Sequence, residues 1–234
     1  MKVFEGSQTR EEYLQIQVAR SSSKFQFCKV SAHDVERYWH ILSSARARDK
    51  GAAPAPGPIL CLGTRNGREV DLFRARFFGS PTVWLAIRQL ERRGPNAFNS
   101  RCPWVEAVGR SCVNDISAKS VIGVELNPQG AQSDVWVGSF DEMPEEWGKQ
   151  FGTVYSNAFD HSQDPHRTIN EWRRVIRPGG YLIFCYVNNQ RVTQADPVGQ
   201  LSSWDVLDLL DGAELLYFRS RASRTGYSEV IVRF

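Results

Sequence analysis

Residues 58–70 of this chain, PILCLGTRNGREV, constrain its fold more than any other segment. The apolar run at 59–62 is too short for a helix and suits a buried strand. Gly63 and Gly67 follow, and apolar residues then recur at helical spacing, so a helix is expected to begin near Asn66 or Gly67. Strand, glycine turn and helix form the first unit of a nucleotide-binding α/β fold, where glycine lets the backbone approach a ligand.

The rest of the chain alternates between short apolar runs and amphipathic stretches. Further strands are predicted at 121–125, 134–138, 151–157, 177–184, 213–219 and 227–234. Helices are predicted at 11–20, 34–42, 83–92, 165–176 and 203–211. Ser31 or the pair His33-Asp34 is expected to cap the second helix, and Asp164 the fourth. The two final strands are expected to form a hairpin that places an antiparallel strand in an otherwise parallel sheet.

We expect two regions along the chain. Residues 1–57 form a helical N-terminal extension that ends in a proline-rich linker, and residues 58–234 form the α/β domain. In nucleotide-binding folds an acidic residue usually follows the glycine turn after about 20 residues. Here the acid is Glu125, which comes much later because of an insertion at about 79–120. This somewhat basic segment is a candidate substrate lid or oligomer surface, and the alternative is a solvated face. A homo-oligomer through this insertion or the N-terminal helices is therefore possible.

Composition excludes several classes of protein. The net charge of +3 is too small to argue for nucleic acid, and no run is long enough to span a membrane. The start of the chain lacks an apolar secretory core. The five cysteines form no C-x-x-C pair, so we expect reduced thiols, no metal site and a cytoplasmic location.

Two later segments carry a family resemblance. Residues 156–161, SNAFDH, and residues 172–180, WRRVIRPGG, follow the predicted fourth strand and lead into the fifth. Together with the glycine turn and the strand order, they resemble the class I S-adenosylmethionine-dependent methyltransferases over roughly residues 58–187. The resemblance implies a Rossmann-like, doubly wound, seven-stranded, mostly parallel sheet with an antiparallel last strand. It also implies S-adenosylmethionine as cofactor and a small-molecule, sugar or natural-product methyl acceptor.

The resemblance also assigns cofactor-binding residues, which lie where strands end. The turn would approach the methionine portion, and an acid after the second strand would accept hydrogen bonds from both ribose hydroxyls. An apolar neighbour of this acid and the loop after the third strand would hold the adenine, and the fourth strand end would meet the methionine end. The residues so assigned are Gly63, Thr64, Arg65, Gly67, Glu125, Leu126, Ser139, Phe140 and Asn157.

Three positions depart from the family pattern. Cys61 and Ser139 stand where acidic residues are usual, and Arg65 stands where a third glycine is usual. Our hypothesis is that the Arg65 guanidinium pairs with the cofactor's carboxylate. The departures keep open an alternative, a catalytically degenerate module that acts as a binding or partner subunit. A nicotinamide-dependent dehydrogenase fits less well, because Gly-x-Gly-x-x-Gly is absent from the turn.

Asp160 and His161 are the candidates for catalysis. Methyl transfer to a hydroxyl requires an aligned nucleophile and a group that removes a proton. Both residues follow the fourth strand closely, and a histidine has a suitable pKa for a general base. The alternative is that the pair only caps a loop.

Overall fold

The computed structural model describes residues 1–6, 9–25, 28–49, 57–92, 120–132, 134–188, 190–220 and 227–234. Most of the predicted linker and of the predicted insertion at 79–120 therefore lies outside the described residues, as do Cys102 and Cys112. The division into an N-terminal extension and an α/β domain stays a prediction.

A seven-stranded sheet runs through the molecule in the order β4-β3-β2-β5-β6-β9-β8. Strands β2 to β6 pair in parallel, whereas β9 is antiparallel to both β6 and β8. This topology confirms the Rossmann-like, doubly wound, mostly parallel sheet with an antiparallel last strand. The strands are β2 (Ile59–Leu62), β3 (Val121–Glu125), β4 (Val135–Val137), β5 (Phe151–Ser156), β6 (Ile176–Val187), β8 (Glu214–Arg219) and β9 (Tyr227–Arg233).

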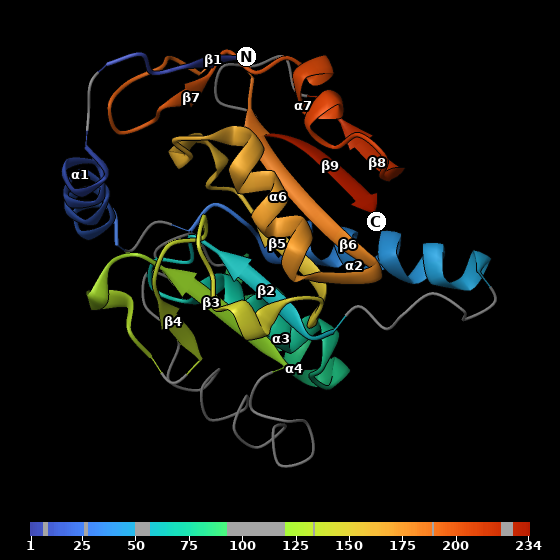
Figure 1. Cartoon of the computed structure of the whole chain (residues 1–234). Coiled ribbons are helices and arrows are strands. Elements are labelled where there is room, and N and C mark those ends of the chain that lie inside the picture. Colours follow the sequence, from blue (N-terminus) through green and yellow to red (C-terminus); the bar gives the residue numbers. More distant parts are fainter. Residues whose placement is uncertain are drawn as a thin grey trace.

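Helices cover both faces of this sheet. Figure 1 shows α6 on the near face and α2 on the far face. The helices are α1 (Arg10–Ser23), α2 (Ala32–Arg48), α3 (Arg68–Phe77), α4 (Pro81–Glu91), α6 (Pro165–Val175) and α7 (Ser203–Leu209). Short 3-10 turns lie at η2 (Pro128–Gly130), η3 (Glu145–Trp147) and η4 (Phe159–His161).

Alternation along the strands divides the core into two clusters. Ile59 and Cys61 pack with α2, α3 and α4, whereas Leu60 and Leu62 pack with α6 and α7. Successive side chains of a strand point to opposite faces, so a strand that is apolar throughout must be covered on both sides. The fully buried Trp172 of α6 anchors the second cluster.

Side-chain caps fix where the helices begin. Ser31 caps α2 by accepting from the backbone N–H of Asp34, whose carboxylate accepts from the N–H of Ser31 in return. Of the two predicted caps, Ser31 is therefore correct, and Asp34 is its partner within the capping box. Asp164 caps α6 with Pro165 at its first position, as predicted. The turn residue Gly67 precedes α3 directly.

The N-terminal segment joins the fold through a short strand that the sequence does not predict. Strand β1 (Lys2–Val3) pairs with β7 (Val198–Gly199) in a separate two-stranded sheet. Helix α1 then lies beyond the strand ends, at the left of Figure 1, and contacts Glu125 at the end of β3, His161 after β5 and Asp196 after β6. Its buried residues are Tyr13, Gln17 and Ser21, and none of its described residues belongs to either core cluster. A polar stripe therefore holds α1 in place.

Two further expectations from the composition concern the cysteines and membrane-spanning helices. Cys28, Cys61 and Cys185 are free thiols, as expected of reduced cysteines. Among the helices of the described part of the chain, none combines the length and the apolar character that a bilayer crossing requires.

Glu69 in the first turn of α3 gives the fold a pH dependence. Burial raises the pKa of this carboxyl from 4.5 to about 7, although the Cys28 thiol and two nearby arginines oppose the shift. Between these pH values the folded state holds a proton that the unfolded state has released, so stability falls as pH rises.

We predict that Glu69 alone costs ~3 kcal/mol of stability between pH 4.5 and 8, and that Glu69→Gln removes this loss. Urea unfolding at both pH values checks it, and equal pH dependence in the two proteins would contradict it.

Candidate functional site

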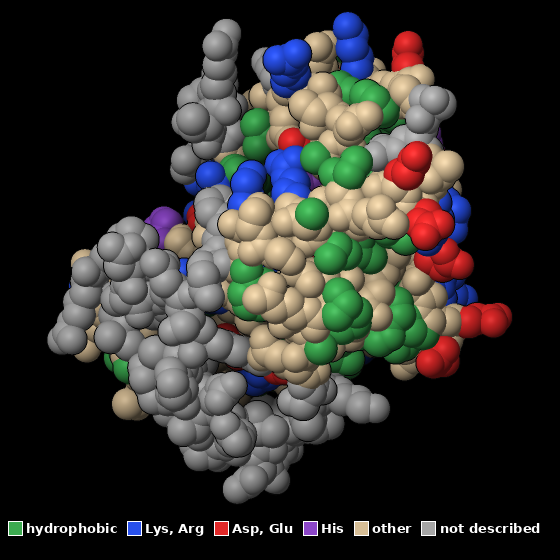
Figure 2. Space-filling model, turned by 90° about the vertical axis from the view of Figure 1, so that its left-hand side faces the viewer, with side chains coloured by type: hydrophobic (Ala, Val, Ile, Leu, Met, Phe, Trp, Pro, Cys, Tyr) green, Lys and Arg blue, Asp and Glu red, His purple; other side chains and the backbone are tan. Residues whose placement is uncertain are grey.

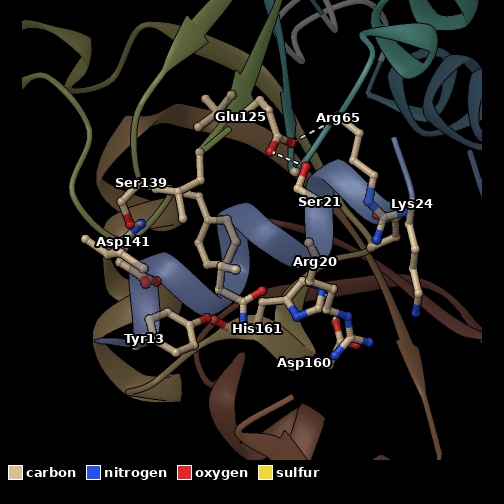
Figure 3. Close-up of a pocket in the computed structure, with 18 of the residues that line it drawn as sticks. Tyr13, Arg20, Ser21, Lys24, Arg65, Glu125, Ser139, Asp141, Asp160 and His161 are labelled. Atoms are coloured by element: carbon tan, nitrogen blue, oxygen red, sulfur yellow. Dashed lines mark hydrogen bonds and ion pairs between the residues drawn. The ribbon is translucent and has the colours of Figure 1, made fainter. Parts of the chain in front are cut away.

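A cavity of about 410 Å³ opens at the carboxyl ends of the parallel strands, and α1 lines part of it. Open α/β sheets bind their ligands at this edge. Thr64 and Gly67 are not among the residues that line the cavity. The other predicted site residues all line it: Gly63, Arg65, Glu125, Leu126, Ser139, Phe140, Asn157, Asp160 and His161. Figure 3 shows how several of them face one another.

The glycine turn forms one wall of the cavity. Gly63 has a φ of 76°, and a Cβ at this position would lie 2.6 Å from the Cβ of Ala158. The close approach of the loop after β5 therefore requires glycine at position 63, whether or not a ligand also needs this space. Arg65 has a φ of 48°, so it adopts a left-handed conformation that glycine adopts more easily. The substitution for the usual glycine thus leaves the shape of the turn intact.

The carboxylate of Glu125 is the best-connected group in the cavity. It is 4% exposed at the end of β3. Oε2 accepts from the backbone N–H of Arg65 at 2.7 Å, and Oε1 accepts from the N–H of Asn127 at 3.0 Å. The Ser21 hydroxyl of α1 donates to Oε1 at 2.8 Å. Two backbone donors hold the carboxylate in place, and the third donor comes from the helix above it.

The loop after β4 forms the opposite wall. Phe140 packs edge-on against the buried Trp172, with ring centroids 5.8 Å apart, so its ring has a fixed position. The Ser139 hydroxyl accepts from the backbone N–H of Asp141 at 3.2 Å. Burial raises the pKa of Asp141 to about 6, while a hydrogen bond from Thr168 opposes the shift. The sequence analysis missed Asp141, although its place two residues after Ser139 was a usable signal.

His161 and Asp160 occupy the third side of the cavity, on η4. The His161 Nδ1 atom lies 3.1 Å from the carbonyl oxygen of Ala195 and 3.3 Å from Oδ1 of Asp196. On the other side of the ring, Nε2 lies 3.9 Å from Oδ1 of Asp160. Burial opposes the charged imidazolium, but the carboxylates of Asp160 and Asp196 outweigh it and raise the pKa of His161 above its ordinary value.

Asp160, His161 and Asp196 offer ligand atoms that lie within 4.8 Å of one another, a spacing that suits a metal ion. However, the Arg20 guanidinium pairs with Oδ2 of Asp196 at 2.7 Å. Gln190 donates to the carboxylate of Asp160 at 2.9 Å. Both carboxylates of this cluster therefore already have partners within the chain, a guanidinium for Asp196 and an amide for Asp160.

Helix α1 supplies functional residues that the sequence analysis missed. The Tyr13 hydroxyl donates to the carbonyl oxygen of His161, and the Gln17 amide donates to that of Ala195 at 2.6 Å. In Figure 3, Ser21 points from the helix toward Glu125, whereas Tyr13 and Arg20 point toward the side of His161 and Asp160. Residues 13, 17 and 21 recur every fourth position, so a polar stripe in the sequence was the available signal.

Basic side chains also border the cavity. Arg20, Lys24, Lys29 and Arg65 line it together with the acids Glu125, Asp141 and Asp160. Figure 2 looks at the molecule from the side on which α1 lies, and Lys and Arg side chains gather in its upper half. The Lys29 Nζ atom lies 4.4 Å from the ring centroid of Tyr227, a cation–π arrangement.

Comparisons with known proteins agree with this geometry. Residues 98–184 match the model of a family described as a methyltransferase domain. No curated protein matches the chain. A 1,6-didemethyltoxoflavin-N1-methyltransferase from Burkholderia thailandensis, solved with 1,6-didemethyltoxoflavin and S-adenosylhomocysteine, has a TM-score of 0.55 at 13% identity, covering 99% of this chain and 93% of its own. The cyclase SpnF has a TM-score of 0.51 at 11% identity, covering 100% and 98%. These matches confirm the resemblance and the fold predicted from the sequence.

The close approach at Gly63 gives a test of the site's construction. We predict that Gly63→Ala lowers the free energy of unfolding by ~2–4 kcal/mol, because it adds left-handed strain and a collision with Ala158. Adding Ala158→Gly should restore part of this loss, since it removes the atom that the new methyl group meets. Urea unfolding of the single and double variants measures both effects. Additive losses in the double variant would show that Ala158 does not cause the strain.

Proposed function

We propose that this chain, which has the class I methyltransferase fold, is an S-adenosylmethionine-dependent methyltransferase that acts on a small-molecule, sugar or natural-product acceptor. The observation that carries the proposal is the buried carboxylate of Glu125, fixed by two backbone donors at the strand-end edge of the cavity. A carboxylate so held is pre-organised to accept hydrogen bonds from a pair of ribose hydroxyls. The methyltransferase-domain match supports this assignment.

The cavity fits the parts of this cofactor. Gly63 at the turn leaves room for the methionine portion, and the Arg65 side chain borders the same cavity, consistent with pairing to the cofactor's carboxylate. Leu126 and Phe140 offer apolar surface for the adenine. The Asp141 carboxyl lies in the same loop and can accept from an exocyclic amine. The backbone of Asn157 remains the candidate partner of the methionine end.

When bound, S-adenosylmethionine supplies an electrophilic methyl group. The protein must then align an acceptor and remove its proton. Nε2 of His161 faces the side of Asp160 rather than Asp196, so it is the nitrogen available to take a proton from an acceptor hydroxyl. Asp160 is held by Gln190 and is the candidate for contacting the acceptor.

Two considerations bear on the acceptor. The cavity must hold the cofactor as well, so about 410 Å³ leaves space for a small acceptor or for one group of a larger molecule. The Burkholderia enzyme with a similar fold was solved with 1,6-didemethyltoxoflavin and S-adenosylhomocysteine bound. Cyclase SpnF has the fold too, so the fold alone does not fix the reaction.

The alternative is a degenerate module that binds without catalysing. Cys61 favours it, because this residue packs in the core where the family pattern places an acid. Ser139 favours it as well, since its hydroxyl already accepts from the chain's own backbone. Failure of the folded protein to bind the cofactor would be the result expected of such a module.

Calorimetric titration with S-adenosylmethionine and S-adenosylhomocysteine tests the proposal. We predict binding of both, weakened ~10–100-fold by Glu125→Gln, because charge-assisted hydrogen bonds to the ribose are lost. Glu142→Gln is the matched control, since Glu142 is an exposed acid that pairs with Arg10 on the molecule's surface. No binding of either ligand to the folded protein would overturn the cofactor assignment.

Ser21 gives a second prediction. Its hydroxyl donates to the oxygen of Glu125 that a ribose hydroxyl would need, so the two compete. Ser21→Ala should therefore tighten S-adenosylhomocysteine binding ~3–10-fold, the contribution of one hydrogen bond. Ser22→Ala is the control, because the Ser22 hydroxyl accepts from the Asn127 side chain. Weaker binding by the Ser21 variant would mean that its hydroxyl helps to hold the cofactor.

A further inference from the structure

His161 lines the cavity, and the groups that contact its Nδ1 atom come from outside its own loop. We propose that Asp196 and Arg20 are positioning residues that fix His161 in the tautomer with Nδ1 protonated and Nε2 open to the cavity. Because Arg20 belongs to α1, the docked N-terminal helix then completes the candidate base. This inference rests on the proposed function for its catalytic meaning, but the positioning itself can be measured separately.

The surroundings of Nδ1 determine the tautomer. Nδ1 lies 3.1 Å from the Ala195 carbonyl oxygen and 3.3 Å from Oδ1 of Asp196. A carbonyl and an ionised carboxylate can only accept, so the ring proton must be on Nδ1 for either contact to be favourable. Neutral His161 then carries its lone pair on Nε2, which is the form that a general base requires.

Asp196 is built to act on this ring. It is 8% exposed, and its Oδ1 has no other hydrogen-bond donor among the groups that the structure describes. Its backbone N–H donates to the Thr193 hydroxyl at 2.9 Å, which fixes the loop. Burial opposes its ionisation, but His161 and Arg20 lower the pKa of Asp196 to about 2. The carboxylate therefore stays charged at any working pH.

Helix α1 holds the backbone on both sides of the contact between His161 and Asp196. Arg20 reaches Oδ2 of Asp196 at 2.7 Å. From the same helix, Tyr13 donates to the carbonyl oxygen of His161, and Gln17 donates to that of Ala195 at 2.6 Å. Pairing of β1 with β7 ties the N-terminal segment to the chain just after Asp196. Undocking α1 would release Asp196 and His161 together, so the helix and the base form one unit.

The groups that face His161 predict opposite effects of two substitutions. Asp160 comes from its own turn, Asp196 from the loop after β6, and Arg20 and Tyr13 from α1. The charge of Asp196 raises the pKa of His161, whereas that of Arg20 lowers it. Asp196→Asn should therefore lower the pKa of His161, and Arg20→Gln should raise it. If Asp196 and Arg20 had only a structural role, their substitutions would not shift the pKa of His161 in opposite directions.

Nuclear magnetic resonance of ¹⁵N-histidine-labelled protein tests this proposal without any ligand. The nitrogen shifts report the tautomer, and a pH titration gives the pKa of each ring. His161→Gln assigns the resonance, and the exposed His166 is the internal control. Arg10→Gln is the matched variant, because Arg10 lies on α1 but pairs with the surface residue Glu142.

We expect neutral His161 to be mainly the Nδ1–H tautomer, with its pKa lowered in Asp196→Asn and raised in Arg20→Gln. Arg10→Gln should leave both unchanged. A mainly Nε2–H tautomer, or no pKa shift in either variant, would overturn the proposal. If Asp196→Asn does not fold, the sign of the shift in Arg20→Gln decides alone. Calorimetry with S-adenosylmethionine reports the proposed function separately, so failure of one leaves the other standing.

Discussion

The buried carboxylate of Glu125 is the interaction on which the candidate site depends. It lies at the end of β3 and gathers donors from the glycine turn, from the residue after its own strand and from α1. Without these donors, a carboxylate that is 4% exposed would be costly to bury. The same contacts that satisfy its charge therefore set the positions of the turn and the helix that enclose the cavity.

The covering helix is held differently from the other helices. Helices α2, α3, α4, α6 and α7 contribute to the two apolar clusters on the sheet, whereas α1 is held by hydrogen bonds and ion pairs to groups of the site itself. Each such contact contributes little net free energy, because water competes for the same groups. Helix docking and the state of the site are thus energetically linked: a ligand that takes the place of Ser21 at Glu125 also changes how α1 is held.

Much of the fold and part of the site could be predicted from the sequence. Continuous apolar strands and periodic helices determine the doubly wound sheet, and residues at strand ends, such as Glu125 and Phe140, meet at one edge by topology. Asp196 and Arg20 could not be found in this way, because their pairing joins an irregular loop to a helix far away in the chain. Strands β1 and β7 have two residues each, too few to show a period. The left-handed backbone of Arg65 was also not predictable, because residues with a side chain such as arginine rarely adopt this conformation, and the turn around Arg65 imposes it.

The most direct test of the account is a crystal structure of the protein with S-adenosylhomocysteine. The account predicts that the ribose hydroxyls bind the Glu125 carboxylate in place of the Ser21 hydroxyl. The adenine should lie against Leu126 and Phe140, and Nε2 of His161 should face the space beside the ligand's sulfur. Ligand bound elsewhere, with Ser21 still donating to Glu125, would contradict the assignment of this carboxylate as the ribose anchor.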